Sequence, residues 1–86
     1  MTSASWTLQR PLLTDTLHAF YATDPTRHER RQVHEWLMDA CIDPVALGGP
    51  DPDVDGLWFG RVVETNLGVL YSIDPKQMKV FVSIIR

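Results

Sequence analysis

The last 21 residues of the chain, NLGVLYSIDPKQMKVFVSIIR, constrain its fold most. Two runs rich in β-branched and aromatic residues flank the segment DPKQ, whose proline suits the second position of a type I turn. We therefore expect a β-hairpin over residues 67–73 and 78–85. The last run is apolar on both faces, which is typical of a strand inside a sheet or one covered by a partner. One face would carry Met78, Val80, Val82 and Ile84, and the other Phe81 and Ile85.

A further strand is expected over residues 57–64, connected to the hairpin by a tight turn at Thr65-Asn66. The segment before it, VALGGPDPDVDG, is predicted to be a loop because it is rich in glycine, proline and aspartate. Near the amino terminus, SWTLQRP predicts a short strand with Trp6 and Leu8 on one side and Pro11 at its end.

Two helices are predicted between these strands. In the first, Leu13, Leu17, Phe20 and Tyr21 repeat with helical spacing, Thr14 is the expected N-cap, and Asp24-Pro25 marks the end. The second begins at Pro25 or Thr26 and ends at Asp43-Pro44. Its apolar stripe comprises Val33, Trp36, Leu37, Ala40 and Cys41.

The expected order is β-α-α-β-β-β, an α+β fold in which the helical hairpin packs on one face of an antiparallel sheet. With 86 residues the chain is expected to form a single domain over 1–86, with residues 1–5 flexible. One cysteine, Cys41, excludes an internal disulfide framework, and no segment has the pattern of a secretory signal or a membrane span. We expect a cytoplasmic protein without a membrane partner.

The net charge of −3 argues mildly against a general nucleic-acid coat, but the charge is unevenly distributed. Residues 1–56 hold four basic and nine acidic side chains, whereas residues 57–86 hold four basic and two acidic ones. The carboxy-terminal sheet is therefore the cationic part of the chain.

The element order resembles that of the RelE/ParE superfamily of small bacterial toxins over nearly the whole chain. The resemblance rests on the Asp-Pro after the second helix, the loop GGPDPDVDGLWFGRV, and the strands GVLYSID and KVFVSIIR. The loop is most similar to the YoeB branch, whose members carry Pro-Glu-Pro before a Gly-aromatic-Trp strand. Here the corresponding residues are Pro50-Asp51-Pro52 and Gly56-Leu57-Trp58.

This resemblance implies a toxin of a type II toxin-antitoxin module, with a cognate antitoxin as its partner. RelE- and YoeB-like members are mRNA interferases that act on the ribosome, while ParE-like members inhibit DNA gyrase. The alternative is a non-catalytic binding module on the same fold that engages gyrase or only its cognate partner. A homodimer is also left open.

The catalytic pattern of the YoeB branch is matched poorly. Its loop glutamate corresponds to Asp51, its arginine to Leu67-Gly68, and its terminal His-Tyr to Ile85-Arg86. The available cations are Arg61 and Arg86, which RNA cleavage would need to stabilise phosphorane charge. We therefore take Arg61, Arg86 and Asp51 as candidate catalytic residues. Solvated arginines and a turn-stabilising Asp51 are the structural alternatives.

Phosphate or partner contacts are further candidate roles for other cations: Arg27, Arg30, Arg31, Lys76 and Lys79. His34, Met38 and Cys41 lie on neighbouring turns and would suit a soft metal, although Met38 and Cys41 fit the edge of the core equally well. No metal site and no cofactor are expected.

Overall fold

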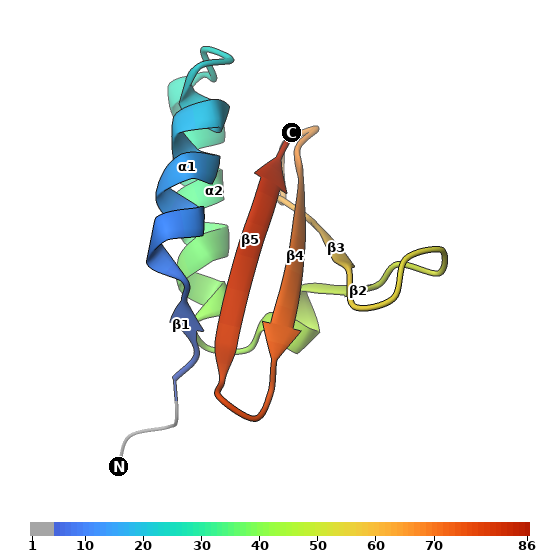
Figure 1. The fold of residues 1–86 in the computed structure, drawn as a ribbon. Coiled ribbons are helices and arrows are strands. Elements are labelled where there is room, and N and C mark those ends of the chain that lie inside the picture. Colours follow the sequence, from blue (N-terminus) through green and yellow to red (C-terminus); the bar gives the residue numbers. More distant parts are fainter. Residues whose placement is uncertain (1–4) are drawn as a thin grey trace.

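Two helices cover one face of a five-stranded mixed sheet in the computed structural model (Figure 1). The structure describes residues 5–86, so most of the segment predicted to be flexible, 1–5, lies outside the described residues. The α+β class and the predicted β-α-α-β-β-β layout are confirmed. The elements are β1 (Thr7–Leu8), α1 (Arg10–Tyr21), α2 (Arg27–Ala40), a 3₁₀ helix (Pro44–Leu47), β2 (Gly48–Pro50), β3 (Trp58–Arg61), β4 (Gly68–Asp74) and β5 (Lys79–Ile85).

The order of the strands is β1-β5-β4-β3-β2. Strands β2 to β5 pair antiparallel, as expected, but β1 runs parallel to β5, so the sheet is mixed. The Thr7 amide donates to the Met78 carbonyl and the Gln9 amide to the Val80 carbonyl, both at 2.9 Å. These bonds place β5 inside the sheet, which confirms the prediction from its two apolar faces.

Strand β2 lies in a segment that was predicted to be loop. Its pairing with β3 aligns Gly48 with Gly60 and Pro50 with Trp58. A Cβ atom on Gly48 would lie 2.2 Å from the Phe59 carbonyl oxygen and 2.8 Å from the Tyr71 hydroxyl, so only glycine allows this close approach. Glycine and proline are rare in strands, and the local sequence GGP therefore gives no strand signal for β2.

Helix α1 begins one turn earlier than predicted. Gln9 is its N-cap, and Pro11 lies in the first turn, where a proline needs no amide hydrogen bond. The predicted N-cap, Thr14, is wrong because this residue lies inside the helix. The helix ends at Tyr21, ahead of Asp24, which adopts a left-handed φ of 58°.

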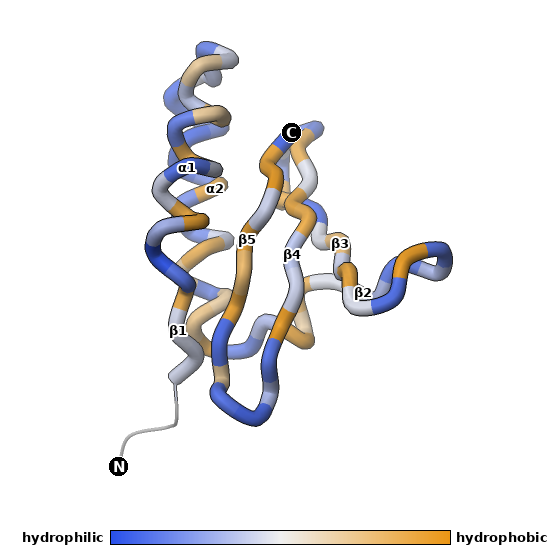
Figure 2. Tube along the Cα trace, in the orientation of Figure 1, coloured by the Kyte–Doolittle hydropathy of each residue, from blue (hydrophilic) through white to orange (hydrophobic). Residues whose placement is uncertain are grey.

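Helix α2 follows the sequence pattern closely. The Thr26 side chain accepts from the Glu29 amide and the Glu29 carboxylate accepts from the Thr26 amide, so the two residues form a capping box. The start predicted at Pro25 or Thr26 is thereby confirmed. The helix ends at Ala40, and Asp43 caps the next element by accepting from the Ala46 amide. Figure 2 shows the alternation of polar and apolar residues along both helices.

The core lies between the helices and the inner face of the sheet, which is the face that the helices cover. Its buried apolar residues are Phe20, Val33, Trp36, Leu37, Ala40, Val62, Val69, Tyr71, Val80, Val82 and Ile85. None of the helices among residues 5–86 combines the length and the apolar content needed to cross a membrane.

A β-bulge reverses the expected faces at the end of β5. Tyr71 pairs with Val82 but Leu70 pairs with Ile84, so Ser83 is an extra residue in β5. Ile85 is therefore buried at 5% exposure and Ile84 is 40% exposed. The prediction that placed Ile84 with Val80 and Val82 was wrong because strict alternation does not survive an inserted residue.

Two strand boundaries also differ from the prediction. Strand β3 ends at Arg61 instead of 64, because Glu64 adopts a φ of 61° and the Thr65 hydroxyl donates to the Val62 carbonyl at 2.8 Å. The connection to β4 therefore spans residues 62–67 and is longer than the predicted Thr65-Asn66 turn. In the β4–β5 turn, Met78 has a φ of 54° and precedes the strand that was predicted to include it.

Candidate functional site on the outer face of the sheet

The outer face of the sheet, which the helices leave uncovered, carries two adjacent rows of side chains. Directly paired residues share a face, and Arg61 pairs with Gly68. Gly68 in turn exchanges two backbone hydrogen bonds with Arg86, at 2.8 and 3.0 Å. These three residues form the arginine row. The next row, here called the apolar row, is Phe59, Leu70 and Ile84.

The arginine row brings together the two cations that the sequence singled out. Arg61 lies on β3 and Arg86 follows β5, with one strand between them, which places their Cα atoms roughly 10 Å apart. Both side chains are exposed. Two guanidinium groups at this spacing can converge on one anionic group, and arginine suits phosphate or carboxylate because its donors form a planar fork.

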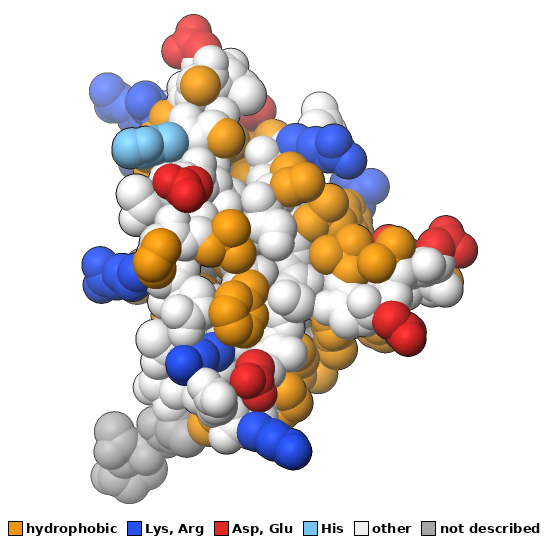
Figure 3. All heavy atoms as spheres, in the orientation of Figure 1, with side chains coloured by type: hydrophobic (Ala, Val, Ile, Leu, Met, Phe, Trp, Pro, Cys, Tyr) orange, Lys and Arg blue, Asp and Glu red, His pale blue; other side chains and the backbone are white. Residues whose placement is uncertain are grey.

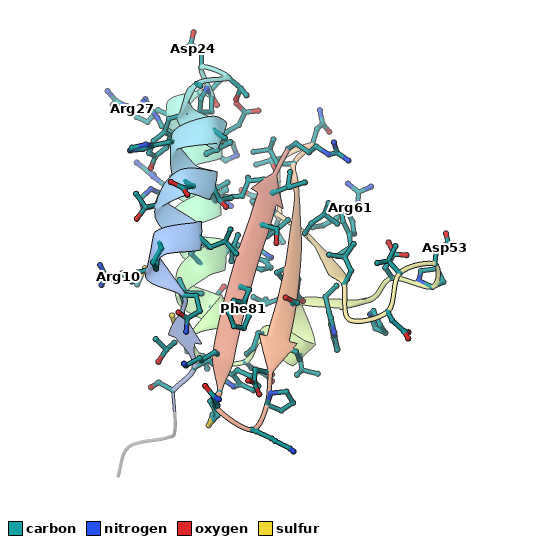
Figure 4. The ribbon with its side chains drawn as sticks, in the orientation of Figure 1. Arg10, Asp24, Arg27, Asp53, Arg61 and Phe81 are labelled. Carbon is teal, nitrogen blue, oxygen red and sulfur yellow. The ribbon has the colours of Figure 1, made fainter. Side chains whose placement is uncertain are left out.

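The ring of Phe59 lies over Gly68, next to the two arginines. A Cβ atom on Gly68 would be 2.4 Å from Cε1 and 2.6 Å from Cζ of that ring, so the ring occupies the space that a side chain would fill. Phe59 nevertheless stays 44% exposed. The site therefore combines an exposed aromatic surface with two flanking cations. Figure 3 shows apolar side chains spread over this face, and Figure 4 places Arg61 and Phe81 on it.

The tyrosine of β4 does not contribute to this surface. Tyr71 faces inward, is completely buried, and donates its hydroxyl to the Pro44 carbonyl at 2.9 Å. Its ring packs edge-on against Trp36, with ring centroids 5.1 Å apart. Burial raises the pKa of Tyr71 to about 12, so this hydroxyl is neutral at physiological pH and holds the 3₁₀ helix against the sheet.

The structure does not bring Asp51 to the arginine row. Its amide donates to the Leu57 carbonyl at 2.7 Å, and β3 then continues for four residues, about 13 Å, to Arg61. One carboxylate oxygen of Asp51 accepts from the amides of Asp53 and Val54, at 2.7 and 3.2 Å. Asp51 therefore stabilises the turn of its own loop, which was the structural alternative for this residue.

The other candidate cations are also separated from the arginine row. Lys76 lies in the β4–β5 turn and Lys79 at the start of β5, about 20 Å along that strand from Arg86. Arg27, Arg30 and Arg31 lie in the first turns of α2, where Arg27 and Arg31 line a shallow pocket with His28. Figure 4 shows Arg27 and Arg61 on opposite sides of the molecule.

Two of the three histidines, His28 and His34, form structural contacts. His34 Nε2 lies 2.6 Å from the Tyr21 hydroxyl and connects the middle of α2 to the last residue of α1, while His28 Nε2 lies 3.0 Å from the Glu64 carbonyl oxygen. Residues 5–86 contain no group of three or more His, Cys, Asp or Glu side chains arranged to hold a metal ion. His34, Met38 and Cys41 do line one apolar pocket, between β1 and the two helices.

Sequence reasoning selected Arg61 and Arg86 but missed the residues that connect them. Gly68 was noted only as the place where an arginine was absent, and Phe59 was not singled out. A glycine placed diagonally to an aromatic residue on the neighbouring strand is a signal of this packing, but it becomes visible only when the register is known. Comparison of the chain with models of protein families, with curated proteins and with solved structures finds no match.

Proposed function

We propose that this protein is the toxin component of a toxin-antitoxin module, similar to RelE/ParE toxins, and that it acts in the cytoplasm by binding RNA on the outer face of its sheet. The observation that carries the proposal is the arginine row, with Arg61 and Arg86 on either side of Gly68 and the Phe59 ring above it. The element order that underlies the family resemblance supports the same assignment.

Single-stranded RNA matches this surface in two ways. A phosphate group between Arg61 and Arg86 would receive charge-assisted hydrogen bonds from both guanidinium groups. A neighbouring base would stack on the exposed Phe59 ring, a contact that contributes about 1–3 kcal/mol per base in proteins that bind single strands. The two contacts are independent of base identity, so we expect weak sequence preference and strong salt dependence.

The geometry supports binding more than cleavage. Cutting RNA at the 2′-hydroxyl requires a general base and a general acid beside the phosphate. No side chain of the arginine row or of the apolar row is a carboxylate or an imidazole, and Asp51 serves its own turn about 13 Å away along β3. We therefore propose a catalytically degenerate relative of an mRNA interferase, which blocks the messenger or the ribosome without cutting.

The apolar row favours a second candidate function. Phe59 and Ile84 are exposed at 44% and 40%, which would suit a protein partner. In this alternative the module engages gyrase or only its cognate antitoxin. Inhibition of gyrase supercoiling by the purified protein, without any affinity for RNA, would favour this alternative over the first proposal.

Two measurements test the proposed function: cell growth after expression of the protein is induced, and binding of RNA by the purified protein. Expression without a partner should arrest growth, and the purified protein should bind a fluorescent single-stranded oligoribonucleotide in an anisotropy titration. The double substitution Arg61→Ala and Arg86→Ala should abolish both effects. Arg10→Ala, compared with each single substitution Arg61→Ala and Arg86→Ala, is the control, because Arg10 is exposed at the start of α1 and lies away from the outer face.

Ribosome toeprinting decides whether any cleavage occurs. The proposal expects no RNA ends at any codon but a block to translation that the Arg61→Ala/Arg86→Ala protein does not cause. Codon-dependent cleavage that requires Arg61 would contradict the non-cleaving mechanism. Harmless expression together with no RNA binding would contradict the proposed function as a whole.

A further inference from the structure

The 51–57 loop, between β2 and β3, projects from the body of the molecule (Figure 1). It carries three of the chain's aspartates, Asp51, Asp53 and Asp55, and no basic residue. Val54 lies between the last two and is 50% exposed. Figure 2 shows an apolar segment between hydrophilic segments in this projecting loop. The loop therefore presents an apolar side chain between two acidic ones.

The loop is held in this form by its own hydrogen bonds. Asp51 accepts from the amides of Asp53 and Val54, and its amide donates to the Leu57 carbonyl. Gly56 adopts a φ of 80°, which allows the chain to return to β3. The carboxylate of Asp51 is occupied by the hydrogen bonds of the turn, whereas the side chains of Asp53 and Asp55 are exposed. A preformed loop loses little conformational entropy when a partner binds it.

The outer face of the sheet is complementary to this loop in charge and in polarity. The arginine row supplies two exposed cations, and the apolar row lies directly beside it. The loop and the arginine row of one chain are separated by the length of β3, about 13 Å from Leu57 to Arg61. The loop also points away from the sheet (Figure 4). The complementary surfaces therefore cannot meet within one molecule.

We propose that the 51–57 loop of one molecule docks on the outer face of a second copy of this chain, and that the contact is reciprocal. Val54 packs on the apolar row, and Asp53 and Asp55 pair with Arg61 and Arg86 of the other copy. Each chain carries both halves of the contact, so a two-fold arrangement closes into a dimer instead of a filament. This dimer covers the surface assigned to RNA above, a consequence that rests on the proposed function.

Sedimentation velocity of the purified protein tests the dimer. At submillimolar concentration and low salt the protein should sediment as a dimer. In about 1 M NaCl, where the Debye length is only about 3 Å, a larger fraction should be monomeric because the four aspartate-arginine pairs are screened. A monomer at low salt would overturn the proposal.

Charge reversal identifies the interface. One variant combines Asp53→Lys with Asp55→Lys, and the other combines Arg61→Glu with Arg86→Glu. Each should be monomeric by itself, because its loop then repels the outer face of an identical copy. An equimolar mixture should form a heterodimer, since the reversed loop meets the reversed face and the native loop meets the native face. The control, Arg10→Glu with Arg27→Glu, makes the same change in charge as the Arg61→Glu/Arg86→Glu variant, but away from the outer face, and should remain dimeric.

Far-ultraviolet circular dichroism establishes that each variant is folded. The mixture is a second control, because a heterodimer can form only if both variants have the native fold. A dimer that persists in the loop variant, or a mixture that stays monomeric, would overturn the proposed interface.

RNA binding is measured separately with Val54→Asp, which should be monomeric and retain affinity for the oligoribonucleotide. If the Val54→Asp protein lost its affinity for RNA, the claim that the outer face binds RNA independently of the loop would be contradicted.

Discussion

The hydroxyl of Thr16 in α1 donates to the Val82 carbonyl of β5 at 2.8 Å, and the Ser83 carbonyl lies 3.1 Å from the same oxygen. Strand β1 pairs with β5 only at residues 79 and 80, so no strand satisfies these carbonyls where the bulge occurs. Thr16 is buried and takes the place of the missing strand. The Thr16 side chain thus satisfies the carbonyls of β5 that β1 does not reach, and it stabilises the bulge.

Replacing Thr16 by valine should lower the free energy of unfolding by about 1–3 kcal/mol, because the Val82 carbonyl stays buried without a donor. Thr16→Ser keeps the hydroxyl and should lower the free energy of unfolding by less than Thr16→Val does. Urea unfolding followed by circular dichroism measures both. Equal stability of the valine variant and the native protein would show that water or another donor reaches the carbonyl.

The bulge predicts an inverted response at the last two isoleucines. Ile85→Ala should lower the free energy of unfolding by about 2–4 kcal/mol, because the side chain is 5% exposed within the core. Ile84→Ala should cost less than about 1 kcal/mol, since Ile84 is 40% exposed on the outer face. Strict strand alternation predicts the opposite order, so thermal unfolding of the two variants distinguishes the two arrangements.

Tyr71→Phe should lower stability at neutral pH by about 0.5–1.5 kcal/mol through loss of the bond to the Pro44 carbonyl. The native protein has an added pH dependence. Because burial raises the pKa of Tyr71 from 10.0 to about 12, its contribution is constant below pH 10 and falls as the pH rises from 10 towards 12. The advantage of the native protein over Tyr71→Phe should therefore shrink as the pH rises from 10 and reverse before pH 12, because a pKa difference of two units corresponds to about 2.7 kcal/mol. A constant difference would mean that Tyr71 ionises equally in both states.

Substitutions of two threonines test the confirmed start of α2 and the corrected start of α1. Thr26→Ala should cost about 1 kcal/mol, because the Glu29 amide loses its acceptor. Thr14→Ala should be neutral or slightly stabilising, because Thr14 is exposed inside α1 and alanine is the better helix former. A large loss in Thr14→Ala would restore that residue as the N-cap of α1.

Gly68→Ala tests the aromatic cover over the arginine row. The added methyl group would clash with the Phe59 ring, so the ring must leave its position over residue 68, between the two arginines. Affinity for single-stranded RNA should fall severalfold while the fold is retained. Gly49→Ala is the matched control, because a Cβ atom there meets nothing within 4 Å. Equal RNA affinity of both variants would exclude Phe59 from the site.

The candidate site was predictable only in part. Arg61 and Arg86 could be selected as cations of the terminal strands, but their common face depends on the pairing of Gly68 with both. Asp51 was selected by its place in the Pro-x-Pro loop, and its hydrogen bonds assign it to the turn. Sequence patterns specify residue types, whereas a site requires distances between separate strands.

The elements with local causes follow from the sequence alone: the two helices, the capping box at Thr26 and the terminal hairpin. These depend on side-chain period, on caps and on turn residues within a few positions of one another. The tertiary structure decided the parallel pairing of β1, the strand at 48–50, the bulge at Ser83 and the arginine row. Each of these forms through hydrogen bonds or packing between residues distant in the chain, as between Thr16 and Val82, and only the folded chain brings such partners together.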